Sequence, residues 1–181
     1  MSIRRAPVPL SFFGIAVGLL AFANTWRTGV RLWHLAEGVA LALTVAALAV
    51  WAGLLALYVR KWFTHRAEAL AELRHPLQSS FAALVPVSGM LAAVALIPFA
   101  RAAATAVVVA AIAAQLALGL TLNGRLWMGG RPPELVTPAV YLPSVAQGFV
   151  AAAASAAFGW PQLGLLFFGA GLLAWLALES I

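Results

Sequence analysis

Two apolar stretches of the sequence each carry a proline, a glycine and uncharged polar side chains within a few residues. They read LVPVSGM (Pro86, Ser88, Gly89) and YLPSVAQGF (Pro143, Ser144, Gln147, Gly148). Hydroxyl and amide groups solvate an ion weakly enough to release it again, which conduction across a membrane requires. The same groups also form hydrogen bonds between membrane helices, typically worth under about 1 kcal/mol each. The residue types leave both interpretations open.

Other chemistry is excluded by what the sequence lacks. Cysteine is absent, so there is no disulfide framework and no thiolate metal site. No acidic or basic residue lies in the middle of an apolar segment, which disfavours a proton pump built on carboxylates. The three histidines, His34, His65 and His75, lie in or beside loops without a helical partner four residues away, so a metal site is not expected. With no nucleophile, deep acid–base pair or phosphate loop, we predict neither an enzyme nor a cofactor.

The composition indicates a polytopic membrane protein. Of the 181 residues, 64% are hydrophobic and 9% charged, and the mean hydropathy is +0.99; in soluble domains about a quarter of residues are charged. The formal net charge of +6 does not indicate nucleic-acid binding. The basic residues stand singly or in pairs between apolar blocks, as flanking charges of membrane helices do.

Six apolar segments approach the roughly 20 residues that cross a bilayer as a helix. They cover Val8–Trp26, Leu35–Val59, Leu77–Ala100, Ala104–Leu126, Pro138–Gly159 and Gln162–Ile181. The sequences between members of each pair, RTGVRLWH, FARAA and GWPQ, are short and join antiparallel neighbours. We therefore predict an all-α transmembrane domain over residues 1–181, made of three consecutive helical hairpins.

Basic residues predict the orientation, because they are enriched in cytoplasmic loops. Eight of them fall on one side of the predicted membrane and three on the other: Arg4, Arg5, Arg60, Lys61, Arg66, Arg74, Arg125 and Arg131 against Arg27, Arg31 and Arg101. The N-terminus is therefore expected in the cytoplasm. Arg4 and Arg5 followed by an apolar run also resemble a signal peptide, but five further spans follow, so a retained helix is favoured.

The first, third and fifth segments contain proline followed by glycine, whereas the second and fourth contain no proline. In the first segment the stretch is PLSFFGIAVG, with Pro9, Gly14 and Gly18. Proline leaves a helix carbonyl without its partner, and in lipid an unsatisfied group costs several kcal/mol. The odd helices should therefore face protein or a water-filled path, and the even ones lipid. Close packing through small residues is the alternative explanation. Spans with no acidic residue at mid-membrane but with basic flanks favour anions.

At these residues the sequence resembles the tellurite-resistance/dicarboxylate transporter family, which includes bacterial TehA-like proteins and plant slow anion channels. The matching pieces are PLSFFGIAVGL, HPLQSSFAALVPVSGML and YLPSVAQGFVAAAASAAFGWPQLGLLFFGAGLLAWLALE. The resemblance covers nearly the whole chain, in the same order and spacing, and is greatest to the bacterial branch.

The resemblance implies ten helices in five hairpins around a pore, with the proline-containing helices forming the inner ring. It also implies a homotrimer in the bacterial inner membrane that passes small anions or C4-dicarboxylates. Carried over by position, the pore-lining residues are Phe12 (or Phe13), Gly14, Gly18, Pro86, Ser88, Gly89, Pro143, Ser144, Gln147 and Gly148.

The sequence departs from the family pattern at its end, because Ile181 falls within the sixth helix. Three of the five hairpins are then present, and the family's gating phenylalanine on the ninth helix is absent. Two functions follow as hypotheses. The chain is an anion channel or transporter of this family, or it is a truncated, non-conducting membrane protein that assembles with a full-length homologue.

Overall fold

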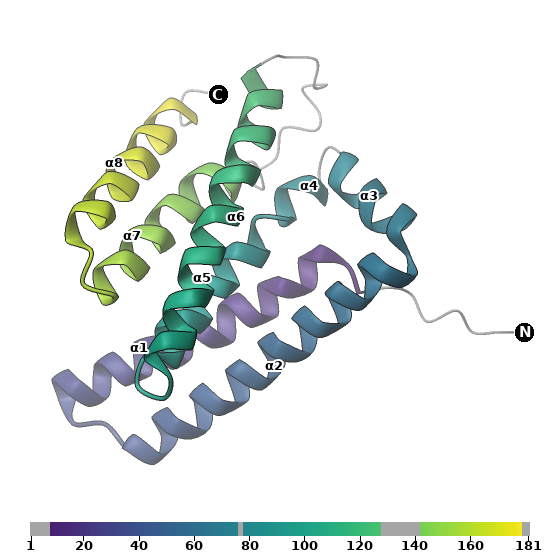
Figure 1. The fold of residues 1–181 in the computed structure, drawn as a ribbon. Helices are drawn as coiled ribbons and strands as arrows, with labels where there is room; N and C mark the ends of the chain where they lie inside the picture. The colour runs from purple at the N-terminus through teal and green to yellow at the C-terminus, as the bar shows by residue number, and fades with distance from the viewer. Residues whose placement is uncertain (1–7, 76–77, 128–141, 179–181) are drawn as a thin grey trace, which may run out of the picture.

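The computed structural model describes residues 8–75, 78–127 and 142–178, and all regular structure in these ranges is helical (Figure 1). The elements are η1 (Leu10–Phe12), α1 (Phe13–Trp33), α2 (Glu37–Thr64), α3 (Arg66–Arg74), α4 (Gln78–Phe81), α5 (Leu84–Leu96), α6 (Arg101–Trp127), η4 (Leu142–Ala146), α7 (Gln147–Ala157) and α8 (Pro161–Leu178).

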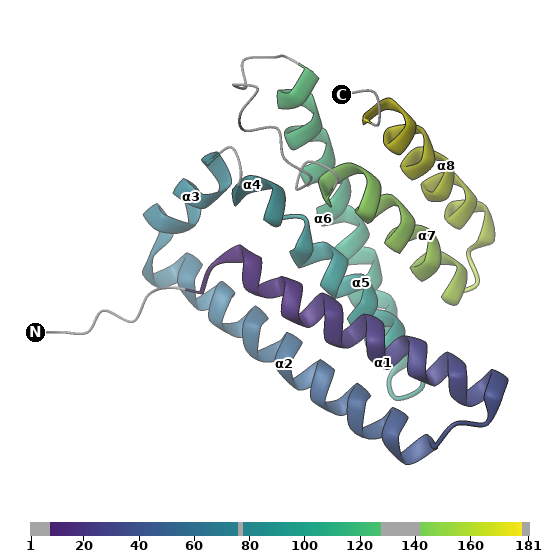
Figure 2. The same ribbon diagram turned by 180° about the vertical axis from the view of Figure 1, so that it is seen from behind.

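The long helices pack as three antiparallel pairs, α1 with α2, α5 with α6 and α7 with α8 (Figures 1 and 2). The first members of the pairs also contact one another, α1 against α5 and α5 against α7, so these three helices form a continuous layer. Helix α5 lies in the middle of that layer. Of the 18 most apolar consecutive residues in the span containing α5, 72% are buried. The corresponding share is 28% for the α1 span and 17% for the α2 span.

Four helical stretches are long and apolar enough to cross a bilayer: Leu10–Trp33, Glu37–Thr64, Gln78–Leu96 and Arg101–Thr121. Two further apolar helices, Leu142–Ala157 and Pro161–Ala177, are shorter. The prediction of an all-helical protein with membrane-spanning helices is thus confirmed. The number of six spans stays a prediction. The predicted starts of the third span at Leu77 and of the fifth at Pro138, and the end of the sixth at Ile181, lie outside the described residues.

Two segments that were expected to be loops are helical. Helix α1 continues to Trp33, so RTGVRLWH is mostly helix and the turn comprises only His34, Leu35 and Ala36. The charged segment after α2 contains α3, whose sequence RAEALAELR consists of strong helix formers. Hydropathy marks where the apolar residues end, whereas a helix ends where its backbone hydrogen bonds end, so the two boundaries differ.

The turn between α7 and α8 has a sequence-encoded geometry. Gly159 has φ +81°, a left-handed conformation that glycine adopts without a steric penalty. Its amide donates to the Ala156 carbonyl at 3.0 Å, and the Trp160 amide donates to the Ser155 carbonyl at 2.9 Å. This pair of bonds is the Schellman helix ending. Pro161 then begins α8, where its missing N–H costs nothing. The predicted tight GWPQ turn is confirmed.

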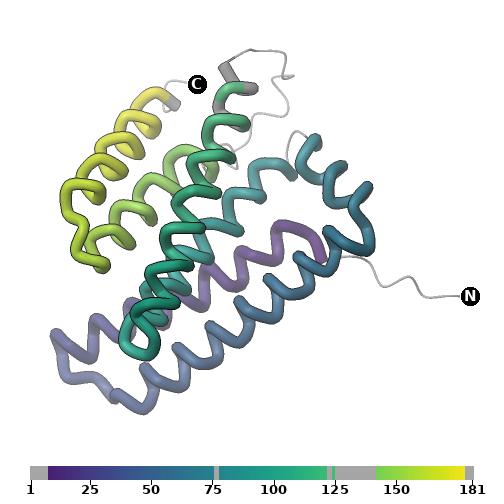
Figure 3. The backbone as a smooth tube through the Cα atoms, viewed as in Figure 1, coloured from purple at the N-terminus to yellow at the C-terminus, as the bar shows by residue number. Residues whose placement is uncertain are grey.

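Each proline-containing segment starts with irregular backbone, and the course of the chain through these starts can be followed in Figure 3. Pro9 precedes the 3₁₀ turn η1, α4 and α5 are separate helices with the break at Ala82 and Ala83, and Pro143 lies in the π-helical turn η4. Helices α2 and α6 are continuous. The predicted alternation of disturbed and plain helices is therefore present, with each disturbance at the start of its helix.

Candidate functional site

The three irregular starts gather at one end of the bundle, here called the proline end. The α4 turn contacts both η1 and η4, and η1 also contacts α5. Helices α1, α5 and α7 all begin there, so their N-termini point toward the same region. Each helix N-terminus carries roughly half a positive elementary charge from its aligned peptide dipoles. Within the inner layer, the proline end therefore gathers the positive ends of the α1, α5 and α7 dipoles, whereas the antiparallel partners α2, α6 and α8 end on that side with the opposite sign.

The backbone at the α4–α5 break keeps its hydrogen bonds by local substitution. Pro86 has no N–H to donate, and the Ala82 carbonyl instead accepts from the Val85 amide at 3.2 Å. The Ala83 carbonyl accepts from the Val87 amide at 3.2 Å. Because proline falls in the first turn of α5, it bends the chain without removing a bond from the helix interior.

Two of the predicted polar residues bond to carbonyls near this break. The Gln147 side chain, 1% exposed, directs Nε2 toward the Ala83 carbonyl at 3.5 Å, linking α7 to the α4–α5 junction. The Ser88 hydroxyl donates to the Val85 carbonyl at 2.8 Å. Ser144 is half-buried in η4, next to buried Pro143. These contacts give Gln147 the interhelical bond that was one of its two interpretations, and the pore-lining role stays a prediction.

The predicted glycines of α5 and α7 face their own hairpin partners. A Cβ placed on Gly148 would lie 2.7 Å from the Cα of Gly171 on α8, and one on Gly89 would lie 3.2 Å from the Ala111 Cβ on α6. Both glycines are buried. Small residues let membrane helices approach closely, and these two positions use that property. The structure thus gives Gly89 and Gly148 a packing role.

The predicted residues on α1 are in a different situation. Gly14 and Gly18 are exposed. A Cβ on Gly14 would meet only the Leu84 Cδ1 at 3.9 Å, and one on Gly18 would meet nothing within 4 Å. Phe12 is 46% exposed, whereas Phe13 is fully buried with its ring edge-on to Tyr58 at 5.7 Å. Of the two candidate phenylalanines, Phe12 is therefore the one on the open face.

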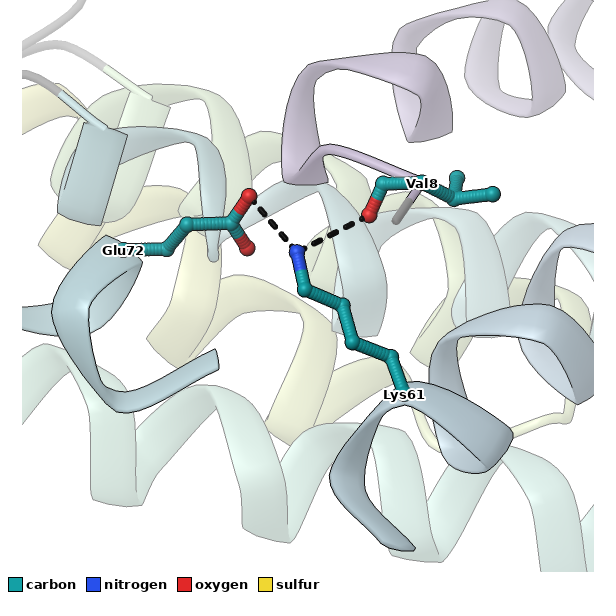
Figure 4. A network of polar contacts seen from close by, with 3 residues as sticks. All are labelled: Val8, Lys61 and Glu72. Atoms are coloured by element: carbon teal, nitrogen blue, oxygen red, sulfur yellow. Dashed lines mark hydrogen bonds and ion pairs between the residues drawn. The ribbon is translucent and has the colours of Figure 1, made fainter. Parts of the chain in front are cut away.

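A buried ion pair at the proline end was not predicted. The Lys61 ammonium at the end of α2 lies 2.8 Å from Glu72 Oε1 on α3 and donates to the Val8 carbonyl at 3.2 Å (Figure 4). Lys61 is only 3% exposed. Sequence reasoning counted Lys61 among the flanking charges of a loop. The helix-forming composition of the segment that holds Glu72 was the available signal, because it places a carboxylate on an ordered element.

Polar side chains within the helices were also missed. Asn24 Nδ2 donates to the Leu91 carbonyl at 3.0 Å, and Arg27 Nη1 donates to the carbonyls of Val94 at 3.3 Å and Ala95 at 3.2 Å. These carbonyls belong to the last turns of α5, where a cation opposes the negative end of the helix dipole. The signal was an asparagine and an arginine one helical turn apart. Hydropathy does not reveal this pair, because it is averaged over many residues and two polar side chains change the average little.

Besides Glu72 Oε2 on α3, two buried polar atoms of the long helices have no hydrogen-bond partner among the described residues, Gln115 Oε1 on α6 and Ser155 Oγ on α7. Ser155 lies at the α7–α8 contact, where its Cβ would be 3.8 Å from a Cβ placed on Gly164. Buried polar groups are normally paired, so these two atoms mark places where the interior remains polar. The interior of the described bundle thus contains uncharged polar groups in addition to the Lys61–Glu72 ion pair.

A bundle of long apolar helices whose inner layer has irregular backbone at one end is typical of a multi-pass membrane protein. The sequence model of the voltage-dependent anion channel family (SLAC1) matches residues 7–181. The chain therefore belongs to this family of channels and transporters, and the family resemblance expected from the sequence is confirmed.

One curated relative is the tellurite resistance protein TehA homolog of Haemophilus influenzae, which is 34% identical over 176 residues. The match covers 97% of this chain and 54% of the relative. The chain thus spans about half the length of the curated relative it matches.

Proposed function

We propose that the chain conducts small anions across the bacterial inner membrane, as all or part of a TehA-like channel subunit. The proposal comprises six spans in a single transmembrane domain, an N-terminus in the cytoplasm and assembly into a homotrimer. Inorganic anions, C4-dicarboxylates and tellurite are the proposed substrates. No covalent step is involved, and family membership supports a transport role rather than an enzymatic one.

One observation carries the preference for anions: the N-termini of α1, α5 and α7 converge at the proline end. Helix N-termini attract anions through the dipole of their aligned peptide groups. Such sites hold an anion without a fixed cationic side chain, so the ion is attracted and still released. The carboxylate of Glu72 at this end is paired with Lys61, which limits its repulsion.

We propose that the path runs along the open face of α1. Phe12, Gly14 and Gly18 present a surface with little side chain at the glycines. Pro86, Ser88, Pro143, Ser144 and Gln147 shape the irregular end of the path. Gly89 and Gly148 support this surface from behind, because their missing side chains allow α6 and α8 to pack closely. The pore-lining role predicted for Gly89 and Gly148 from the family resemblance stays a prediction.

The test is anion flux in liposomes that contain the purified chain, with nitrate, chloride, malate and tellurite as test ions. Changing Gly18→Phe or Gly14→Phe should lower the flux at least about fivefold, because each ring would enter the open face. The matched control is Gly169→Phe on α8, a glycine whose Cβ also meets open space. Cation flux equal to anion flux, or equal loss in the control, would refute the proposal.

A second function is favoured by the same open face of α1. A glycine surface with nothing packed on it also suits contact with another helix. In this alternative the chain does not conduct and assembles with a full-length homologue. Co-purification with such a homologue, together with no flux from the chain alone, would favour this alternative over conduction.

A further inference from the structure

A cleft of about 390 Å³ opens at the end of the bundle away from the proline end. It lies between the end of α1, the start of α2 and the turn that joins α5 to α6. Arg27 and Arg31 of α1 and Glu37 of α2 supply its charged lining, and Leu41 and Phe99 belong to its apolar lining. None of the residues proposed for the anion path lies in this cleft.

Arg27 is held in position before any ligand arrives. Its Nη1 atom is fixed by the Val94 and Ala95 carbonyls at the end of α5. In the part of the chain that the structure describes, its Nε and Nη2 atoms make no hydrogen bond. A guanidinium presents its donors in a planar fork that matches the oxygens of phosphate and carboxylate groups. One side of the Arg27 fork thus anchors the residue, and the other side remains available to an oxyanion.

Arg31 lies one turn further along α1 and lines the same cleft. Its Nη2 atom is oriented by the Thr28 hydroxyl at 3.2 Å. Glu37 is exposed at the start of α2, and the described residues include no ion pair between Glu37 and either arginine. The charged lining therefore carries one net positive charge, which favours a ligand with a single negative charge.

The position of the cleft indicates where that ligand comes from. The cleft lies at the ends of the apolar stretches Leu10–Trp33 and Glu37–Thr64, the depth at which the headgroups of a bilayer meet membrane helices. Leu41 is 52% exposed and Phe99 is 55% exposed. Apolar surface thus adjoins the arginines directly. A soluble anion would leave this surface unused, whereas a lipid would cover it with an acyl chain.

We propose that the cleft binds the phosphodiester of an anionic phospholipid, with the phosphate between Arg27 and Arg31 and an acyl chain against Leu41 and Phe99. Glu37 limits the site to a single negative charge and disfavours a doubly charged free anion. The site is independent of the anion path and survives even where conduction fails.

The test is native mass spectrometry of the purified full chain titrated with phosphatidylglycerol, phosphatidylcholine or inorganic phosphate. The informative variant is Arg31→Gln, because Arg31 makes one surface hydrogen bond, whereas loss of Arg27 would also release the α5 carbonyls. The matched control is Arg101→Gln, an exposed arginine on α6 at the same end and outside the cleft lining. Circular dichroism checks that each variant keeps its helices.

We expect phosphatidylglycerol to bind more tightly than phosphatidylcholine. Arg31→Gln should weaken that binding about tenfold, the loss expected for a hydrogen bond to a charged group. Arg101→Gln should leave it unchanged, and Glu37→Gln should strengthen it. Equal effects of the two arginine variants would show a general charge effect and overturn the site. Displacement of the lipid by millimolar inorganic phosphate would overturn the assignment to lipid.

Discussion

The glycines of α1 and those of the α7–α8 pair have the same side chain and opposite surroundings. Gly18 of α1 has open space where a Cβ would be, whereas the Cβ of a residue at 148 would lie 2.7 Å from the backbone of α8. In α7 the missing side chain lets two helices approach, and in α1 it leaves a bare surface. A glycine in a membrane helix is therefore informative only once its neighbours are known.

Among substitutions that test this comparison, Gly148→Ala is expected to have the largest effect on stability. The new methyl group would meet the Gly171 backbone, which cannot rotate away, so α7 and α8 must separate. We expect a loss of about 3 kcal/mol in stability, the upper part of the usual range for overpacking. Thermal unfolding in detergent would measure it, with Gly169→Ala as the control because its Cβ meets nothing within 4 Å. An unchanged unfolding temperature would contradict the packing role.

The next largest effect on stability is expected for Gly159→Ala, which tests backbone conformation separately from steric contact. Gly159 has open space around its Cβ but a φ of +81°, so Gly159→Ala is strained by conformation alone. We expect a loss of about 1–2 kcal/mol. The readout is limited proteolysis at the α7–α8 turn alongside thermal unfolding. Should the variant match Gly169→Ala, the turn does not need the left-handed residue.

A smaller effect is expected for Gly89→Ala, whose Cβ would lie 3.2 Å from the Ala111 Cβ. A side-chain methyl group yields more easily than backbone, so the expected loss is about 1 kcal/mol. The double variant Gly89→Ala with Ala111→Gly restores the space and should recover much of that loss. A double-mutant cycle on unfolding free energies measures the coupling, and zero coupling would show that the two positions do not touch.

The smallest effect on stability is expected for Gly18→Ala. The position is open, and alanine is favoured over glycine inside a helix by up to about 1 kcal/mol. We expect unchanged or slightly higher thermal stability in the same detergent assay. A clear loss of stability would show that α1 is covered at this point in the assembled protein, which favours the assembly function over the open path.

Much of this architecture could be predicted from the sequence, because its signals are local. The hairpin between α7 and α8 follows from Gly159 and Pro161, and the breaks at the starts of the odd helices follow from their prolines. The orientation of individual side chains could not be predicted. Gly14 and Gly148 stand beside prolines or polar residues alike, and only the packing of α8 against α7 tells them apart. Likewise, Arg27 reads as a turn residue until the end of α5 is placed beside it.

The ion pair between Lys61 and Glu72 also bears on the order in which the protein is made. The ammonium of Lys61 bridges the Val8 carbonyl, ahead of η1, and a carboxylate on α3, so all three partners belong to the first part of the chain. Proteins emerge from the ribosome N-terminus first and fold in units as they do so. The interactions that tie the start of α1 to the end of α2 therefore all come from residues that precede α5. The α1–α2 hairpin can reach its final packing before α5 and the helices after it have been synthesised. Helix α5 then packs against an α1 that is already in position.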